Sequence, residues 1–149
     1  EFKIKDGKGN IKEYNYDGIL EFEGEYLYGK KSGKGKEYNI NGILEFEGEY
    51  LNGIKNGKGI EYNYNGKLKF EGEYIKGIKW NGIGYDINGN IEFKIKDGKG
   101  YIKEYGFDGE LEFEGEYLDG KRNIKGKEYN YDSELEFWKE YLNGRKIFK

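Results

Sequence analysis

The chain has 149 residues, and 26 Lys and Arg against 29 Asp and Glu give it a formal net charge of -3. It contains no Cys and no His, which excludes disulfides, thiol nucleophiles and imidazole bases, and the balanced charge argues against nucleic acid as the main partner. Although the mean hydropathy is -1.05, aromatic residues make up 18% of the chain and recur regularly. We therefore expect a folded chain whose core is built from Phe and Tyr.

A five-residue motif, Phe-Glu-Gly-Glu-Tyr, recurs along the chain at an almost fixed spacing. Complete copies stand at Phe22–Tyr26, Phe46–Tyr50, Phe70–Tyr74 and Phe113–Tyr117, and degenerate copies begin at Phe2, Phe93 and Phe137. The steps between the leading Phe residues are 20, 24, 24, 23, 20 and 24 residues. A period of this length predicts stacked supersecondary units. We expect one continuous array over residues 1–149, with units starting near 2, 22, 46, 70, 93, 113 and 137, as a fragment of a longer chain.

The unit spanning residues 44–69 illustrates the expected elements in chain order. Residues 44–50 alternate apolar and glutamate positions, which predicts a strand with one apolar face. Residues 52–59 are rich in Asn, Gly and Lys and predict a long loop. Residues 60–64 predict a second strand, and Asn65-Gly66 predicts a two-residue hairpin turn before the next unit. The array is thus expected to be an all-β, single-layer antiparallel meander of tandem β-hairpins, elongated and twisted, with about thirteen strands.

The central glycine of the motif points to the aromatic face in this scheme. At Gly48 the missing side chain would let a ring from the neighbouring strand lie over the backbone. The units that begin at Phe2 and Phe93 lack this glycine. They also share one sequence, because residues 1–9 and 92–100 both read EFKIKDGKG, at an offset of 91. A tight Asp-Gly turn replaces the long loop there. These short units, and the unit with Phe137-Trp138-Lys139, which has lost the glycine, are expected to be distorted or to act as boundaries.

Catalytic and metal chemistry find little support in the residues. Glu45, Glu47 and Glu49 have the chemistry of an acid–base pair, but the alternation favours a solvated strand face. Residues 29–35 (GKKSGKG) lack the Gly-Lys-Ser/Thr order and the following helix of a phosphate loop. No loop has the calcium-binding pattern of an EF-hand. We expect no catalytic residue, no metal and no cofactor.

The aromatic face is the first candidate binding site. It can pack against Tyr38, Tyr62, Tyr64 and Tyr129 of the second strands, or remain partly open as a Tyr-rich groove for a protein partner or a second copy of the chain. Exposed terminal strands would also permit end-to-end assembly. The candidate residues are Phe22, Tyr26, Phe46, Tyr50, Phe70, Tyr74, Phe113 and Tyr117.

The second candidate is a basic rim formed by the expected loops. Such a rim would meet an anionic membrane surface, or would only keep a repetitive sheet soluble and oppose edge pairing. Its residues are Lys30, Lys31, Lys34, Lys36, Lys55, Lys58, Lys121, Arg122, Lys125 and Lys127.

The unit from Phe46 to Tyr62 resembles the MORN repeat, with its aromatic-x-Gly-x-aromatic strand, spaced glycines and Gly-x-Gly before a second strand. The resemblance covers nearly the whole chain, and residues 65–74 look like the variant found in bacterial antitoxin-like proteins. It implies an extended hairpin stack that acts as a scaffold or adaptor, often at membranes or the cytoskeleton. We therefore expect a non-catalytic scaffold for protein–protein interaction or self-assembly. The alternatives are a peripheral module that binds anionic phospholipids, and the repeat array of an enzyme or filament whose other parts lie outside this sequence.

Overall fold

The fold is taken from a computed structural model that describes residues 3–106, 109–129, 135–142 and 145–147. These residues form fourteen strands and no helix, and therefore no helix that could span a membrane. The strands are β1 (Lys3–Lys5), β2 (Lys8–Tyr14), β3 (Leu20–Leu27), β4 (Lys30–Tyr38), β5 (Leu44–Leu51), β6 (Ile54–Tyr62), β7 (Leu68–Ile75), β8 (Ile78–Tyr85), β9 (Ile91–Ile95), β10 (Gly100–Tyr105), β11 (Leu111–Leu118), β12 (Lys121–Tyr129), β13 (Leu135–Leu142) and β14 (Arg145–Ile147).

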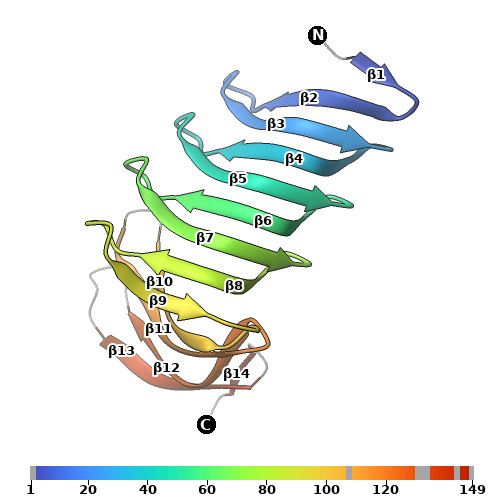
Figure 1. The fold of residues 1–149 in the computed structure, drawn as a ribbon. Helices are drawn as coiled ribbons and strands as arrows, with labels where there is room; N and C mark the ends of the chain where they lie inside the picture. Colours follow the sequence, from blue (N-terminus) through green and yellow to red (C-terminus); the bar gives the residue numbers. More distant parts are fainter. Residues whose placement is uncertain (1–2, 107–108, 130–134, 143–144, 148–149) are drawn as a thin grey trace.

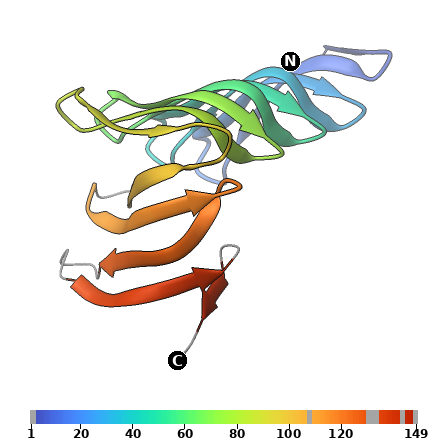
Figure 2. The same ribbon diagram turned by 60° about the horizontal axis from the view of Figure 1, so that its bottom comes forward.

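The strands follow one another as an antiparallel meander, which confirms the predicted fold class. Each strand from β1 to β9 pairs with the next in one nine-stranded sheet, and β10 to β14 form a five-stranded sheet in the same way. Figure 1 shows the first sheet as an elongated series of hairpins that begins at the N-terminus. The hydrogen-bonded ladder is interrupted between β9 and β10, and in Figure 2 the second sheet leaves the end of the first at an angle.

The predicted long loop is wrong: most of residues 52–59 belong to a strand. β6 begins at Ile54, directly after the turn at Asn52 and Gly53, and pairs with both β5 and β7. The ladder between β5 and β6 shifts register between Gly48 and Tyr50, and Gly57 has a φ of +107°. A bulge thus absorbs the extra residues within the strand, where sequence reasoning assigned a loop.

The hairpin turns also differ from the prediction. The two-residue turns lie at the end where the loop was expected, and both central residues have positive φ, as at Asn52 (52°) and Gly53 (88°). At the predicted turn, the Asn63 amide donates to the Lys67 carbonyl, so the loop that this bond closes contains three residues. Of these three residues, only Gly66 has a positive φ. The Asn63 Oδ1 accepts the Lys67 amide, which favours the wider loop.

The motif glycines form a continuous row across the first sheet. Neighbouring strands place them directly opposite one another, in the order Gly24, Gly35, Gly48, Gly59, Gly72 and Gly82. A Cβ at Gly48 would lie 2.6 Å from the Lys58 carbonyl oxygen and 2.7 Å from both the Gly59 Cα and the Phe46 ring. The ring over Gly48 therefore comes from the same strand, and not from the neighbour as predicted. The row also brings adjacent backbones close together.

The corner between the sheets lies in the second short unit, in agreement with the prediction that such units act as boundaries. Ile95 pairs with Gly82 and Ile102 pairs with Gly115, so each isoleucine stands at a position in the row where the long units have glycine. Both isoleucines are 3% exposed, and the Phe93 ring stacks on Phe70. β9 and β10 do not pair with each other, and the pair recorded between the two segments is the isolated bridge of Lys96 with Lys99, just outside both strands.

Candidate functional site: the two faces of the array

The aromatic face is built from one four-residue cluster that repeats along the array. Each cluster contains the Phe and the Tyr of the motif, a Glu nine residues before the Phe, and a Lys or Arg nine residues after it. The described copies are Phe22/Tyr26/Glu13/Lys31, Phe46/Tyr50/Glu37/Lys55, Phe70/Tyr74/Glu61/Lys79 and Phe113/Tyr117/Glu104/Arg122. We call each of these an ionic–aromatic cluster. The sequence repeats the same spacing around Phe137, whose side chain lies outside the described part.

The cluster on β6, β7 and β8 shows the contacts. The Lys79 Nζ lies 4.7 Å from the centre of the Phe70 ring and 2.8 Å from the Glu61 carboxylate. The Tyr74 hydroxyl donates to the same carboxylate at 2.5 Å. One cation thus contacts a ring and a carboxylate together, and the Glu61 carboxylate receives both a cation and a hydroxyl.

Partial burial of these clusters shifts their titration. Burial raises the pKa of the Glu61 carboxyl, but Lys79 and the Tyr74 hydroxyl outweigh burial and leave that pKa below its usual value. Burial, together with the charge of Glu61, raises the pKa of Tyr74. Burial and the hydrogen bond to Glu13 raise the pKa of Tyr26 to about 12. The folded state therefore favours an ionised carboxylate at Glu61 and neutral hydroxyls at Tyr26 and Tyr74.

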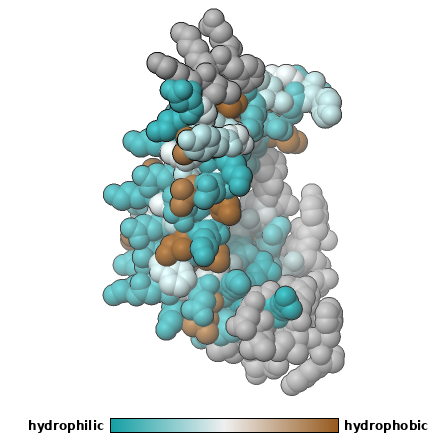
Figure 3. All heavy atoms as spheres, turned by 90° about the vertical axis from the view of Figure 1, so that its right-hand side faces the viewer, coloured by the Kyte–Doolittle hydropathy of each residue, from teal (hydrophilic) through white to brown (hydrophobic). Residues whose placement is uncertain are grey.

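The aromatic residues predicted as a binding face are mostly core residues. Phe22, Phe46, Phe70 and Phe113 are at most 1% exposed, and Tyr50 and Tyr74 are 4% and 3% exposed. Clusters interlock edge to face, since the Phe22 ring lies 5.5 Å from Tyr50 and the Phe46 ring 5.5 Å from Tyr74. Only Tyr26 and Tyr117 are half-buried. Figure 3 shows the right-hand side of the view in Figure 1, where the described residues are mostly hydrophilic and the hydrophobic ones form small separate groups.

The tyrosines of the second strands do not pack against this aromatic face, contrary to one prediction. The Tyr38 hydroxyl donates to Glu23 at 2.6 Å, and Tyr62 donates to Glu47 in the same way. These glutamates alternate with the motif aromatics and therefore lie on the opposite, charged face. Tyr85, Tyr105 and Tyr129 repeat the contact with Glu71, Glu92 and Glu114. Tyr64 is 47% exposed in a turn.

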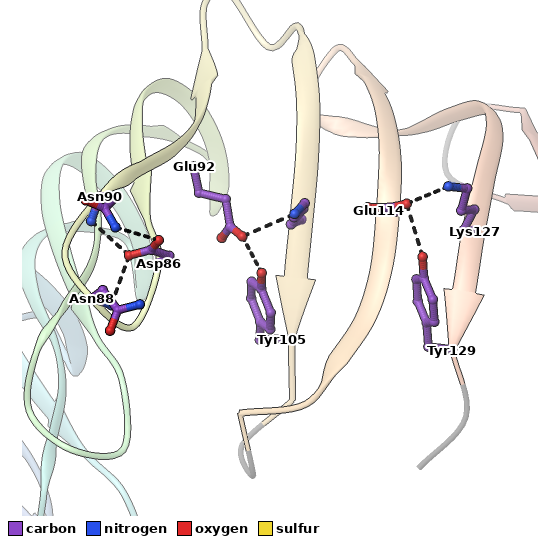
Figure 4. Close-up of polar contacts among 9 residues, drawn as sticks. Asp86, Asn88, Asn90, Glu92, Tyr105, Glu114, Lys127 and Tyr129 are labelled. Carbon is purple, nitrogen blue, oxygen red and sulfur yellow. Dashed lines mark hydrogen bonds and ion pairs between the residues drawn. The ribbon is translucent and has the colours of Figure 1, made fainter. Parts of the chain in front are cut away.

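The tyrosine–glutamate contact also crosses the interrupted ladder. Figure 4 shows the Tyr105 hydroxyl of β10 pointing to Glu92 of β9, next to the equivalent pair of Tyr129 and Glu114. Lys103 approaches Glu92 to 3.4 Å, and Lys127 donates to Glu114 at 2.8 Å. The hydrogen bond from Lys127 lowers the pKa of the Glu114 carboxyl. Side-chain contacts therefore join β9 to β10 where most backbone pairing is absent.

The charged face carries an open groove of about 1420 Å³ across β2 to β6. Glycines of the row form its floor, and acidic and basic side chains alternate along its walls. The charged residues are Lys12, Glu23, Glu25, Lys34, Lys36, Glu47, Glu49 and Lys58. The fourth residue of the motif binds a backbone amide of the following strand. The Glu49 carboxylate accepts the Lys58 amide at 2.7 Å, and the Glu25 carboxylate accepts the Lys34 amide at 3.1 Å. We call this surface the charged groove.

The lysines predicted as a basic rim lie on both faces. Lys31, Lys55 and Arg122 belong to ionic–aromatic clusters, whereas Lys34, Lys36 and Lys58 line the charged groove. Lys30 and Lys121 are exposed beside two-residue turns, Lys127 is bonded to Glu114, and the Lys125 side chain lies outside the described part.

The carboxylates weighed as an acid–base pair have structural partners. Glu47 accepts the Tyr62 hydroxyl, and Glu49 accepts a backbone amide across the bulge. Among the described residues, no group of three or more acidic side chains is placed to hold a metal ion. Sequence reasoning missed the ionic–aromatic clusters, although the spacing of nine residues on either side of each motif Phe was visible in the chain.

Comparison with known proteins adds no assignment to this geometry. No protein-family model matches the chain, and no curated protein matches it.

Proposed function

We propose that this protein is a non-catalytic repeat scaffold that binds a protein partner along the charged groove. The observation that carries the proposal is the alternation of exposed lysines and carboxylates over a glycine floor, repeated from one hairpin to the next. The aromatic face is a weaker candidate, because its rings are used in internal packing.

The groove favours an extended partner with charges of both signs. Lys34, Lys36 and Lys58 are exposed on the strands, and their neighbouring carboxylates already accept bonds from tyrosines or backbone amides. The carboxylates are thus held in place before a partner arrives, which reduces the entropy lost on binding. Alternating charges supply specificity for a partner whose own charges match their order. The resemblance to MORN repeats, which act as scaffolds and adaptors, agrees with this role.

Charge reversal within the groove tests the proposal. A Lys34→Glu, Lys36→Glu, Lys58→Glu variant should lose a partner that the parent retains in quantitative co-purification, and moderate salt should weaken the parent complex. The matched control is Lys30→Glu, Lys76→Glu, Lys121→Glu, which changes the net charge equally at exposed sites outside the groove. If both variants retain the same partners as the parent, the groove is not the binding surface.

A further inference from the structure

The first hairpin repeats the sequence of the corner between the two sheets. Residues 1–9 and 92–100 are identical, and residues 11–14 are identical to 102–105. The turns have the same backbone, with φ values of 53° and 75° at Asp6 and Gly7 and of 50° and 72° at Asp97 and Gly98. In the second copy this segment has the β7–β8 hairpin ahead of it, whereas β1 is the edge of its sheet.

The corner shows what a β7–β8 hairpin contributes to such a segment. The Gly98 amide donates to the Trp80 carbonyl at 2.8 Å, and a Cβ at Gly98 would lie 2.7 Å from the Trp80 ring. Lys79 and Ile78 of β8 line a cavity of about 410 Å³ together with Ile102 and Tyr117 of the second sheet. The hairpin therefore covers the turn and encloses the start of the next sheet.

The equivalent positions at the N-terminal edge are less covered. Ile102 is 3% exposed, but Ile11, which holds the same place in the repeat, is half-exposed. At Gly7 the close ring is that of Tyr28, since a Cβ there would lie 2.6 Å from it, and Tyr28 is itself 80% exposed. Tyr28 adopts a φ of 49°, which is unusual for an aromatic residue, and the second block has Asp119 at this place. Tyr28 thus lies where the corner has Trp80.

We infer that the edge formed by β1 to β3 is a docking surface for a hairpin of the β7–β8 type from the same kind of repeat. Such a hairpin presents Phe, Tyr and Lys on its aromatic face and a Trp beside the turn. It takes the place of the Tyr28 ring over Gly7 and covers Ile11. The contact then reproduces at the first hairpin the corner that this chain forms 91 residues further on.

A fusion protein tests this docking surface directly. A copy of residues 67–91 is joined ahead of Glu1, so that the junction reproduces the sequence of residues 90–93. We expect the Gly7 amide to exchange at least tenfold more slowly with solvent than in the parent, and the Tyr28 ring resonances to shift, both measured by NMR. The control is the same fusion with Trp80→Asn in the added copy, since Asn56 holds the equivalent place on β6.

The readout is calibrated within the parent chain. Trp80→Asn should accelerate exchange of the Gly98 amide, because that variant weakens the existing corner. The inference is supported if the fusion protects Gly7 and the Asn control protects it less. It is overturned if the Gly7 amide exchanges at the same rate in the fusion as in the parent, whether the added hairpin folds elsewhere or does not fold. It is also overturned if the Trp80→Asn fusion slows exchange of the Gly7 amide as much as the unmodified fusion does.

Discussion

Replacing Gly48 with alanine should destabilise the protein far more than the size of one methyl group suggests. Three atoms lie within 2.7 Å of the position of the new Cβ, and two of them belong to the backbone of the next strand, at Lys58 and Gly59. A flexible side chain could move away, but a paired strand can give way only by opening the ladder. Restoring ordinary contact distances requires the two strands to separate by about 0.7 Å, since Cβ contacts below about 3.4 Å are rare.

The expected cost is about 2–3 kcal/mol. Overpacking of a well-packed site costs about 1–3 kcal/mol, and weakening one or two ladder hydrogen bonds adds about 1 kcal/mol each. The lower entropy of the unfolded alanine chain offsets about 0.4–1 kcal/mol of this. Urea unfolding should show a lower midpoint at an unchanged slope. The control Glu45→Ala lies on the same strand and should stay within about 0.5 kcal/mol of the parent. A Gly48→Ala midpoint equal to the parent's would refute the close approach of β5 and β6.

Three further predictions address the charged and strained residues. Lys79→Met should cost about 1–2 kcal/mol because it leaves the Glu61 carboxylate without its cation, and the double variant with Glu61→Gln should recover part of this in a urea double-mutant cycle; additive losses would contradict the coupling. Lys76→Asn should stabilise the protein by about 0.5–1 kcal/mol, because Lys76 has a φ of 48° in a two-residue turn, and an unchanged melting temperature would argue against strain there. The protein should lose stability between about pH 10 and pH 12, because folding raises the pKa of several tyrosines from 10.0 to about 12. The stability that these neutral tyrosines contribute is complete below the pKa of the unfolded chain, and it is lost as the pH rises through the pKa of the folded protein. Urea midpoints that stay constant from pH 9 to pH 12, with tyrosine ionisation followed by absorbance, would contradict the values near 12 at Tyr26, Tyr38 and Tyr62.

The period-two alternation of the motif was sufficient to predict the strands that carry the motif and the face on which its Phe and Tyr lie. Phe46 and Tyr50 lie together on the buried face, as the alternation requires. The extent of β6 was not predictable in this way, because a bulge at a glycine and a loop at a glycine have the same composition. Gly57 reads as a loop residue in sequence, and only its pairing with Tyr74 on β7 shows that the strand continues through it.

The turns and the corner show a second limit of local reasoning. Asn-Gly is a strong hairpin signal, but the Asn63 side chain, two residues earlier, accepts the Lys67 amide and favours a wider loop. The corner was foreseen only as a boundary, since the departure from the motif at Phe93 was visible in the sequence. The corner places Ile95 and Ile102, from the two sides of the break, in one buried cluster, and the local pattern does not specify that they come together.

The ionic–aromatic clusters explain how a chain with so few aliphatic residues keeps a single-layer sheet folded. A Phe ring on an open sheet has no second layer to cover it, and the stem of a Lys from the next strand supplies that cover while its charge lies over the ring. A carboxylate such as Glu37 then holds the Lys55 ammonium, at 3.1 Å, and keeps the cover in place. Because the same kinds of residue recur in each described cluster, the side chains of this face contact one another and stabilise the fold. The opposite face holds its glutamates with tyrosines and backbone amides and leaves Lys34, Lys36 and Lys58 exposed, and for that reason recognition is expected there.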